Sequence, residues 1–582
     1  MNSSPKSGGP LIVQSDRVVL LDVHHELADE AREVLASFAE LVKSPENLHT
    51  YRISPLSLWN AAASGIDPDD VVSFLGAYAR NRVAKAVRNE VGSLMRRFGR
   101  LILRRRDDKL LLMVSHDLWE DVISLKAIED MIISWDGDIC EIVLEEAYRG
   151  EIKRVLTRAG MPVEDLAGYV EGDSLEINLT DRLGVDDDAP PFDLRPYQRD
   201  AAAAFYQDGM ERGGNGVVVL PCGSGKTIVG IGVMDLYQTK TLILTNNRTS
   251  VRQWVREVCE KTDLAPDQVA EYSADVKNIA SVTATTYQML TYRSREDDTF
   301  PHFDMFMKSN WGLVIYDEVH LLPAPVFRMC AELQARRRLG LTATLVREDG
   351  REDDVFSLIG PKRFDMPWRR LERGGFIAEA KCVEMRVPLT PYSAEKYELS
   401  NRRGQYRLAS ENPLKLKVLQ ALLARHAGER VLIIGMYLQQ LAIIRTLVGA
   451  DLITSRTSQD RREELYGQFR TGEISTLIVS KVANFAVDLP DANIAIQVSG
   501  TFGSRQEEAQ RVGRILRPKA EGTETVFYTL VSTDTSEVRF ADNRQLFMTE
   551  QGYSYTIVDA QTEFSHLDWS DSEDEMVIID GE

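Results

Sequence analysis

From about residue 192 onward, short apolar runs alternate with stretches that have helical periodicity. The runs are NGVVVL, KTLILT, WGLVIYDE and RLGLTAT, and later RVLIIG, ISTLIVS, ANIAIQVS and TVFYTLV. Continuous β-branched runs of about four to seven residues, each followed by a helix-like stretch, are typical of parallel strands covered by helices on both faces. The runs fall into two sets, separated near residues 380–412. The pattern therefore predicts two tandem α/β domains, each with a doubly wound parallel sheet.

The part of the chain before this pattern is mixed. An alternating, strand-like LIVQSDRVVLLDV precedes the helical patterns HELADEAREVLASFAELVK and PLSLWNAAASG, and residues 66–106 are mostly helical and end in a basic stretch. Short segments such as KLLLMVS and DICEIVLEEA then indicate a small α/β module, which the acidic, proline-containing GVDDDAPPFD separates from the rest. We predict five parts: 1–106, 107–190, 191–380, 381–560 and an acidic tail at 561–582.

Composition excludes several classes of protein. No run approaches about 18 uninterrupted apolar residues, so no transmembrane segment is predicted. MNSSPKSGGP has no apolar stretch and does not resemble a secretory signal. The five cysteines form no CxxC pair, which argues against a structural zinc or iron–sulfur site and suits the reducing cytoplasm. They are Cys140, Cys222, Cys259, Cys330 and Cys382.

The net charge of −20 opposes long-range attraction of nucleic acid. Any polyanion must therefore bind at local basic patches. The candidate patches are Arg96, Arg97, Arg100 and Arg104–Arg106, then Arg336–Arg338, then Arg369 and Arg370. Each patch alone is more typical of a solvated face than of a nucleic-acid contact.

A phosphate-binding loop is predicted between the run NGVVVL and the helical IVGIGVMDLY. The segment is Leu220-Pro-Cys-Gly-Ser-Gly-Lys-Thr227, a variant in which Leu220 stands where the strict pattern has glycine. Gly223, Ser224 and Gly225 allow backbone N–H groups to face phosphate oxygens, and the helix N-terminus adds a favourable dipole. Lys226 is expected to reach the β- and γ-phosphates, and the Thr227 hydroxyl to bind Mg²⁺.

Two adjacent carboxylates end the apolar run WGLVIYDE. Asp317 is placed to hold Mg²⁺, and Glu318 to polarise the water that attacks the γ-phosphate. A lone Asp-Glu pair is usually only the end of a strand. Following a phosphate loop in this order, it indicates a nucleotide hydrolase.

Two further groups complete the predicted nucleotide site. Arg195 and Gln198, upstream of the loop, can place an amide edge against adenine. In QRVGRILR, three arginines are spaced by three residues, which on a helix places them on one face. These residues, Arg511, Arg514 and Arg517, can stabilise charge that develops on the γ-phosphoryl group, although a surface salt-bridge helix would have the same spacing.

The order of these motifs resembles that of superfamily 2 helicases, and several segments are similar to the XPB family of repair and transcription-initiation helicases. The segments are LRPYQRDA, LTATLVRED, SKVANFAVDLPDANIAIQVSG, GSRQEEAQRVGRILRPK and FYTLVSTDTSEVRFADNRQLFMTEQGYSY. The resemblance covers about residues 190–558, and residues 1–185 look like the N-terminal and damage-recognition regions of prokaryotic members. It implies two RecA-like motor domains and ATP-dependent 3′-to-5′ movement on, or unwinding of, DNA.

The resemblance also implies residue roles. Arg514 and Arg517 would be arginine fingers with Arg511 in support, and Asp488 would face the nucleotide. Residues implied for the DNA track are Thr286, Tyr287, Thr342, Thr344, Ser480 and Lys481, and Arg347, Glu348 and Asp349 match a motif associated with duplex opening. Contacts from hydroxyls, backbone N–H groups and lysine would suit a motor that does not read sequence. The region TPYSAEKYELSNRRGQYRLASENPLK is shorter than the thumb-like insertion of archaeal relatives, which weakens the expectation of a grip on duplex DNA through that element.

The expected mechanism is ATP held between two domains, so that hydrolysis loosens the cleft and shifts the strand contacts. The sequence leaves three alternatives open: a duplex translocase that remodels complexes without unwinding, a damage-binding scaffold whose ATPase is a switch, and, less favoured, an RNA helicase. We expect DNA, ATP and Mg²⁺ as ligands, a possible nuclease partner, a monomer, and a cytoplasmic, nucleoid-associated location.

Overall fold

The computed structural model divides the chain into two compact units, the first running to Met366 and the second beginning at Pro367. Each unit is described by itself. The structure describes residues 8–44, 47–106, 109–145, 148–167, 171–180, 192–210, 212–221, 223–293, 300–322, 324, 329–330, 333, 335–345, 352–378, 380–480, 492–500, 508, 511–512, 525–553 and 555–570. No helix among these residues is long and apolar enough to cross a membrane.

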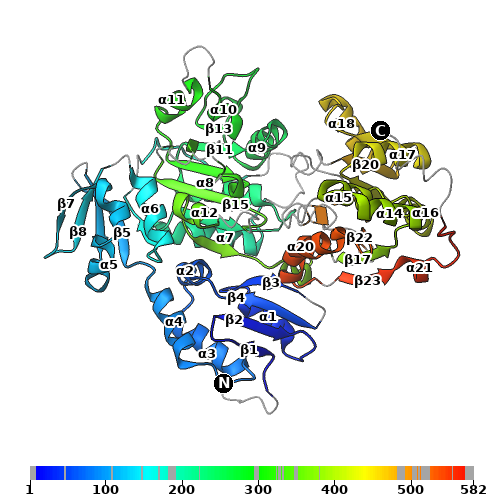
Figure 1. Cartoon of the computed structure of the whole chain (residues 1–582). Coiled ribbons are helices and arrows are strands. Elements are labelled where there is room, and N and C mark those ends of the chain that lie inside the picture. Colours follow the sequence, from blue (N-terminus) through cyan, green and yellow to red (C-terminus); the bar gives the residue numbers. More distant parts are fainter. Residues whose placement is uncertain are drawn as a thin grey trace. The chain divides into compact units, whose positions relative to one another are not determined.

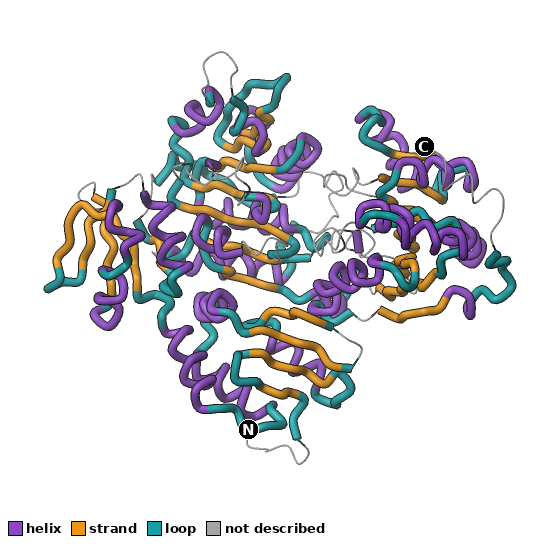
Figure 2. Tube along the Cα trace, viewed as in Figure 1, coloured by secondary structure: helices purple, strands orange, loops and turns teal. Residues whose placement is uncertain are grey.

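The first unit is built around a seven-stranded sheet whose strands are all parallel, as predicted (Figures 1 and 2). The strand order is β12-β13-β11-β14-β15-β10-β16. The strands are β10 (Asn215–Val219), β11 (Thr241–Thr245), β12 (Val269–Tyr272), β13 (Val282–Thr286), β14 (Leu313–Asp317), β15 (Arg337–Thr342) and β16 (Lys362–Asp365). Their central residues are almost all buried, which explains why the sequence shows continuous apolar runs and not alternation.

Helices cover both faces of this sheet. One layer consists of α7 (Pro196–Tyr206), α8 (Lys226–Tyr237) and α9 (Arg248–Lys261), which contact one another. The opposite face packs into a core with α10 (Tyr287–Leu290), α11 (Pro301–Met307), the 3₁₀ turn η6 (Val319–Leu321) and α12 (Glu352–Leu358). The two layers bury the sheet, and its polar chemistry is left at the strand ends.

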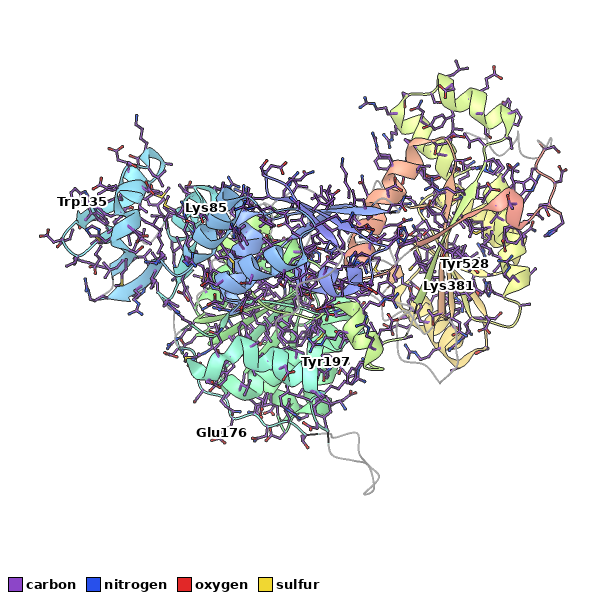
Figure 3. The ribbon with its side chains drawn as sticks, turned by 90° about the horizontal axis from the view of Figure 1, so that it is seen from below. Lys85, Trp135, Glu176, Tyr197, Lys381 and Tyr528 are labelled. Atoms are coloured by element: carbon purple, nitrogen blue, oxygen red, sulfur yellow. The ribbon has the colours of Figure 1, made fainter. Side chains whose placement is uncertain are left out.

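The second unit has a second seven-stranded, all-parallel sheet in the order β19-β20-β18-β21-β22-β17-β23. The strands are β17 (Ala380–Val387), β18 (Val431–Gly435), β19 (Asp451–Ile453), β20 (Thr476–Ser480), β21 (Ile494–Gln497), β22 (Thr525–Ser532) and β23 (Tyr555–Asp559). Lys381 of β17 and Tyr528 of β22, labelled in Figure 3, lie on neighbouring strands. The main helices of this unit are α13 (Trp368–Arg373), α14 (Pro391–Leu399), α15 (Arg402–Ser410), α16 (Leu414–Arg425), α17 (Leu438–Val448), α18 (Gln459–Thr471), α20 (Ser536–Glu550) and α21 (Ala560–Glu563).

The second unit begins earlier than the predicted start at residue 381. The reason is that α13 packs within it. The Trp368 ring lies edge-on to that of Tyr553, with centroids 6.4 Å apart, and the Trp368 N–H donates to the Gln551 side chain at 3.0 Å. The region of the thumb-like insertion consists of α14 and α15, which are nine residues each.

The N-terminal part of the first unit contains a four-stranded antiparallel sheet in the order β1-β2-β4-β3, drawn in blue in Figure 1. Its elements are β1 (Leu11–Val13), β2 (Val18–Asp22), α1 (Ala28–Leu35), β3 (Glu40–Lys43), β4 (Leu48–Arg52), α2 (Pro55–Ala63), α3 (Pro68–Tyr78) and α4 (Lys85–Arg96). The predicted helix through residue 43 is wrong at its end, because residues 40–43 pair with β4 as an edge strand.

Helix α2 joins this N-terminal part to β16, the last strand of the first seven-stranded sheet. The Lys362 N–H donates to Asn60 Oδ1 at 2.9 Å, and the Ser64 hydroxyl donates to the Lys362 carbonyl at 3.0 Å. Arg363 adds a bond to the Ala63 carbonyl at 3.4 Å. The helix therefore lies over the outer side of β16.

The small α/β module is a five-stranded sheet in the order β7-β8-β6-β5-β9. Its elements are β5 (Leu101–Arg106), β6 (Lys109–Val114), α5 (Trp119–Ile123), β7 (Ile132–Asp136), β8 (Glu141–Leu144), α6 (Arg149–Arg158) and β9 (Val163–Asp165). Because β5 and β6 pair as a hairpin, the predicted boundary between 106 and 107 is wrong and the basic arginine run is part of a strand. Trp135, on the edge strand β7, lies at the outer side of this module in Figure 3.

Candidate nucleotide site at the edge of the first sheet

The predicted phosphate loop leaves the C-terminal end of β10 and enters α8. The Leu220 N–H donates to the Thr342 carbonyl at 3.0 Å, which fixes the start of the loop to β15. Gly223 and Gly225 have φ values of 78° and 80°, in the left-handed region that glycine adopts without strain. A Cβ on Gly225 would lie 2.5 Å from the Gln198 amide nitrogen, so only glycine fits there. Lys226 and Thr227 follow at the N-terminus of the 12-residue α8, where N–H groups favour an anion.

Strand register brings the other motifs to the same edge. Val219 is paired with Thr342 of β15, and Asp317 of β14 is paired with Leu341. All these strands are parallel, so their carboxyl ends meet where ligands bind in open α/β sheets. The loop after β10 and the carboxylates after β14 are therefore neighbours, although about 90 residues separate them.

Asp317 is held by two aromatic side chains that the sequence analysis did not assign to it. The Trp254 indole Nε1–H donates to Asp317 Oδ2 at 3.0 Å, and the Tyr287 hydroxyl donates to the Asp317 carbonyl at 2.9 Å. Burial and the neighbouring Glu318 together raise the pKa of Asp317 to about 6, against the opposing effects of the Trp254 bond and Lys226. A half-buried carboxylate with a raised pKa next to a lysine is typical of a functional site.

Glu318 leaves the strand with a φ of 55°, so the two acids do not continue the alternation of β14. Its carboxylate lies 3.3 Å from His320 Nδ1, and the same nitrogen lies 3.1 Å from the Thr342 hydroxyl. That hydroxyl donates to the Thr344 carbonyl at 2.7 Å. His320 thus connects the strand end that carries the acids with the strand end of β15.

Gln198 is part of this site, on α7 directly after Tyr197, which Figure 3 labels. Its side-chain oxygen accepts a bond from the Arg195 N–H at 3.0 Å, and its side chain is buried against the phosphate loop at Gly225. The structure therefore brings Arg195, Gln198 and the loop together. Contact of these groups with adenine stays a prediction.

The side chains predicted for the DNA track are mostly interior. Tyr287, Thr342, Thr344 and Ser480 have relative exposures of 0%, 0%, 1% and 2%. These side chains are therefore buried in this structure, and their contact with a DNA strand stays a prediction. The physical reason is local: the Tyr287 and Thr342 hydroxyls bond to backbone or to groups at the strand ends. Thr286 is half-buried and caps α10 by accepting the Met289 N–H at 3.2 Å.

In the second unit, Arg511 is only 2% exposed and its guanidinium bonds to Gln497 at the end of β21. Gln497 in turn donates to Glu508 at 3.0 Å. This placement suits the supporting role that was expected for Arg511 and leaves it no exposed face. Seven other predicted residues lie outside the described part of the chain: Arg347, Glu348, Asp349, Lys481, Asp488, Arg514 and Arg517.

The basic patch at Arg336–Arg338 is only partly exposed, because its side chains contact other residues of the first unit. Arg338 is 4% exposed and donates to the Leu358 carbonyl at 3.0 Å, while Arg336 and Arg337 pair with Glu171. Sequence analysis also missed Trp254 and His320 as parts of the nucleotide site. The histidine follows the acidic pair directly and so carried a signal, whereas Trp254 lies 63 residues from Asp317 and could be found only through the fold.

The donor set at this edge fits a divalent metal. Asp317 and Thr227 offer a carboxylate and a hydroxyl beside the phosphate loop, and oxygen ligands of this kind suit Mg²⁺ shared with a triphosphate. The raised pKa of Asp317 supports this fit, because a cation would relieve the repulsion between Asp317 and Glu318.

Three family profiles match the chain. "ERCC3/RAD25/XPB C-terminal helicase" matches residues 371–580, "Type III restriction enzyme, res subunit" matches residues 191–347, and "Helicase conserved C-terminal domain" matches residues 11–134. The first covers the second seven-stranded sheet, and the second covers the phosphate loop, the acidic pair and the end of β15.

Characterised relatives match nearly the whole chain. It is 49% identical to the DNA 3′-5′ helicase XPB of Mycobacterium tuberculosis, over 95% of this chain and 98% of the relative. It is 31% identical to the general transcription and DNA repair factor IIH helicase/translocase subunit XPB of Enterocytozoon bieneusi, over 94% and 92%. Among solved structures, the Pyrococcus furiosus Hef helicase domain matches 60% of this chain and 97% of its own, with a TM-score of 0.41 and 15% identity.

Proposed function

Because the chain belongs to the XPB family of DNA helicases, we infer that it is an ATP-dependent DNA helicase that moves in the 3′-to-5′ direction. The observation that carries this inference is the edge of the first sheet, where the phosphate loop, Asp317 and Glu318 come together in the order that a helicase requires. By its relatives' names, we further propose a role in DNA repair.

The residues at this edge divide the hydrolysis between them. Gly223, Ser224 and Gly225 offer backbone N–H groups to the phosphates, and Lys226 neutralises the charge that grows on the β–γ bridge. Glu318 orients the attacking water and accepts its proton. The link from His320 to both Glu318 and the Thr342 hydroxyl suits a role in holding the base in place.

We propose that Thr227 and Asp317 hold Mg²⁺, which supplies Lewis-acid stabilisation of the phosphate oxygens when bound. Trp254 and Tyr287 would keep the Asp317 carboxylate and its backbone in place for this task. Arg514 and Arg517 are proposed as arginine fingers, Arg511 as their support and Asp488 as a nucleotide contact. Gln198 and Arg195 are proposed for the adenine.

For the DNA track, we propose that backbone N–H groups at the strand ends carry the contacts, together with Thr286 and Lys481. The buried hydroxyls of Thr342, Thr344 and Ser480 would shape those ends and not touch DNA. Arg347, Glu348 and Asp349 are proposed to act on the duplex junction.

The experiment compares Lys226→Ala and Glu318→Gln with the unchanged full chain. We expect each variant to lose at least about 100-fold in DNA-stimulated ATP hydrolysis, because each removes a group that acts on the transition state. Binding to forked DNA without nucleotide should stay within about twofold. Asp304→Asn, an exposed acid on α11, serves as a control of equal charge change to Glu318→Gln. Full ATPase activity in both variants would overturn the site.

A duplex translocase is the second candidate, favoured by the name of a relative, the general transcription and DNA repair factor IIH helicase/translocase subunit XPB. Two assays separate the functions. A helicase displaces a labelled strand from a forked duplex, whereas a translocase displaces a triplex-forming strand and leaves the duplex paired. Stimulation of ATPase by DNA and RNA of one length tests the preference for DNA.

We also propose that the protein works as a monomer near the nucleoid in the cytoplasm and that a nuclease partner supplies any cleavage. Support comes only from the family resemblance. Light scattering of the purified protein, alone and with forked DNA, tests the monomer.

A further inference from the structure

A small cavity lies within the first unit, between the five-stranded module and the first seven-stranded sheet. Its volume is about 40 Å³. One wall comes from α6 and β9 of the module, and the other from the start of β15, the end of α12 and the start of β16. The module is also joined here by Arg158, which bonds to Asp354 of α12 at 3.4 Å, and by Thr157, which meets Ser357 at 3.4 Å.

Basic side chains dominate the described wall of this cavity. Four of them are at least nine-tenths buried: Arg149 (6% exposed), Lys153 (6%), Arg338 (4%) and Arg363 (8%). Two more, Arg212 and Arg336, have side chains that are 59% and 38% exposed and lie toward solvent. The acids among the described lining residues are Glu164 and Asp165.

Both carboxylates already have cationic partners. Asp165 accepts from Arg149 Nη2 and from Lys153 Nζ, both at 2.7 Å, so one acid serves two cations. Glu164 lies 3.2 Å from Arg212 Nε. The described lining therefore carries six basic groups against two acids, and one of the six, Arg336, also pairs with Glu171 outside the lining.

The remaining buried guanidinium groups are attracted to the same two acids, Arg338 to Asp165 and Arg363 to Glu164, and their described hydrogen bonds go to backbone carbonyls. Arg338 donates to Leu358 at 3.0 Å, and Arg363 donates to Asn215 at 2.9 Å and to Arg212 at 2.7 Å. A carbonyl satisfies a hydrogen bond but carries no net charge. Buried cations in excess of buried acids cost free energy unless an anion balances them.

The electrostatics agree with a positive cavity. Burial, together with Arg338 and Arg149, lowers the pKa of Lys153 to about 8, even though Asp165 acts in the opposite direction. The pKa of Asp165 is held well below its usual range by Lys153 and Arg149, against the effect of burial.

We propose that this cavity is a binding site for a single tetrahedral oxyanion of the phosphate class, held between the five-stranded module and the first seven-stranded sheet. A cavity of 40 Å³ takes about three waters, by a need of roughly 10–15 Å³ each, and so takes one phosphate group but not a nucleoside. Guanidinium groups match the oxygens of such an anion with paired, charge-assisted hydrogen bonds.

A bound oxyanion would connect two parts of the first unit. Arg149 and Lys153 come from α6 of the module, whereas Arg338 and Arg363 come from β15 and β16 beside the strand that carries the phosphate loop. Occupancy is therefore expected to stiffen the attachment of the module to the sheet. This inference does not depend on the helicase activity.

The test uses the full chain with Lys226→Ala, so that the phosphate loop contributes little to phosphate binding. Equilibrium dialysis with ³²P-labelled inorganic phosphate should show one phosphate bound per chain. Phosphate or sulfate, at a concentration near 100 times its Kd, should also raise the melting temperature of the first unit. We expect it to be about 3 °C higher than in chloride at equal ionic strength.

Two variants in this background remove one cation each. Lys153→Met removes a buried cation and retains the apolar part of the side chain. Arg336→Met removes a partly exposed cation, so it remains informative if Lys153→Met does not fold. We expect each to weaken phosphate binding at least about fivefold. Arg256→Met, an exposed arginine of α9 with a 60% exposed side chain, should leave it unchanged.

The result that would overturn the proposal is an absence of phosphate binding in the Lys226→Ala chain, or binding that both cavity variants leave intact. The source of the phosphate group is distinguished by competition. Duplex DNA that displaces labelled phosphate assigns the site to a DNA phosphate, and DNA that leaves it bound assigns the site to free phosphate.

Discussion

The two seven-stranded sheets differ in how acidic side chains are paired at their polar ends. In the first, Asp317 and Glu318 are adjacent and repel each other, and the pKa of Asp317 is raised to about 6. In the second, buried acids face cations: Lys415 Nζ lies 2.8 Å from Glu537 Oε2, with both side chains 0% exposed, and Arg544 Nε lies 3.6 Å from Glu508 Oε2.

This difference indicates that the polar end of the first sheet is suited to ligand binding, whereas that of the second sheet is suited to holding a fixed geometry. Two like charges at one edge leave a site whose balance must come from an added cation. A buried pair with both members satisfied has no such need, and it fixes α16 to α20 in a single geometry. The same architecture thus serves chemistry in one unit and positioning in the other.

The largest expected effect comes from breaking a pair in the second unit. Lys415→Met leaves Glu537 buried without its cation, and we expect the free energy of unfolding to fall by about 3–5 kcal/mol. The double variant Lys415→Met/Glu537→Leu should recover most of this loss. Urea unfolding followed by circular dichroism measures both. Equal losses in the single and double variants would show that the pair is not the cause.

The first sheet should respond in the opposite direction. Asp317→Asn removes the repulsion from Glu318 and keeps an acceptor for Trp254. At pH 8, without Mg²⁺ and nucleotide, we expect the free energy of unfolding of this variant to be about 1–2 kcal/mol higher than that of the unchanged chain. This value allows for the partial exposure of the site.

The pH dependence of that gain follows from the raised pKa. The folded carboxyl has a pKa of about 6 against an ordinary value of 3.8, so its ionised form is disfavoured in the folded state. The loss of stability caused by ionised Asp317 therefore has its full size above pH 6. It shrinks as the pH falls from 6 toward 4, and it is absent below that. Thermal melts at pH 4.5 and 8 test it, and an equal gain at both values contradicts the assignment.

The smallest effect is expected for Trp254→Phe, which removes the donor to Asp317 and keeps an aromatic ring. The Mg²⁺ concentration for half-maximal ATPase should rise about three- to tenfold, because loss of one oriented hydrogen bond costs about 1 kcal/mol. Trp311→Phe is the matched control, since its indole donates at 2.9 Å to the Phe306 carbonyl away from the site. Stability should fall similarly in both variants, but the Mg²⁺ requirement should change only in the first.

Much of the fold could be predicted because its signal is local. Strands buried on both faces are continuous apolar runs, and a phosphate loop needs its glycines in sequence, so both sheets and the loop were predicted. Residues 40–43 were not, because a short ELVK segment has no periodicity of its own and becomes a strand only by pairing with β4.

The parts of the site that sequence could not supply depend on contacts between distant elements. A threonine at a strand end, such as Thr342, has the same local pattern whether its hydroxyl meets DNA or a neighbouring carbonyl. Arginines at 336–338 have the same composition as an exposed patch, yet Arg338 is interior because α12 and α6 pack beside it. Spacing along the chain does not distinguish these cases.

The bonds from α2 to β16 have a practical consequence for dissecting the protein. Strand β16 is the last in its sheet, and α2 occupies the side on which a further strand could add. A truncated ATPase core that lacks α2 would leave β16 as an exposed edge strand. Exposed edge strands pair readily with strands of other molecules. A shortened protein for crystallisation or kinetics should therefore retain residues 55–64, or replace the cover that they give to β16, to avoid self-association.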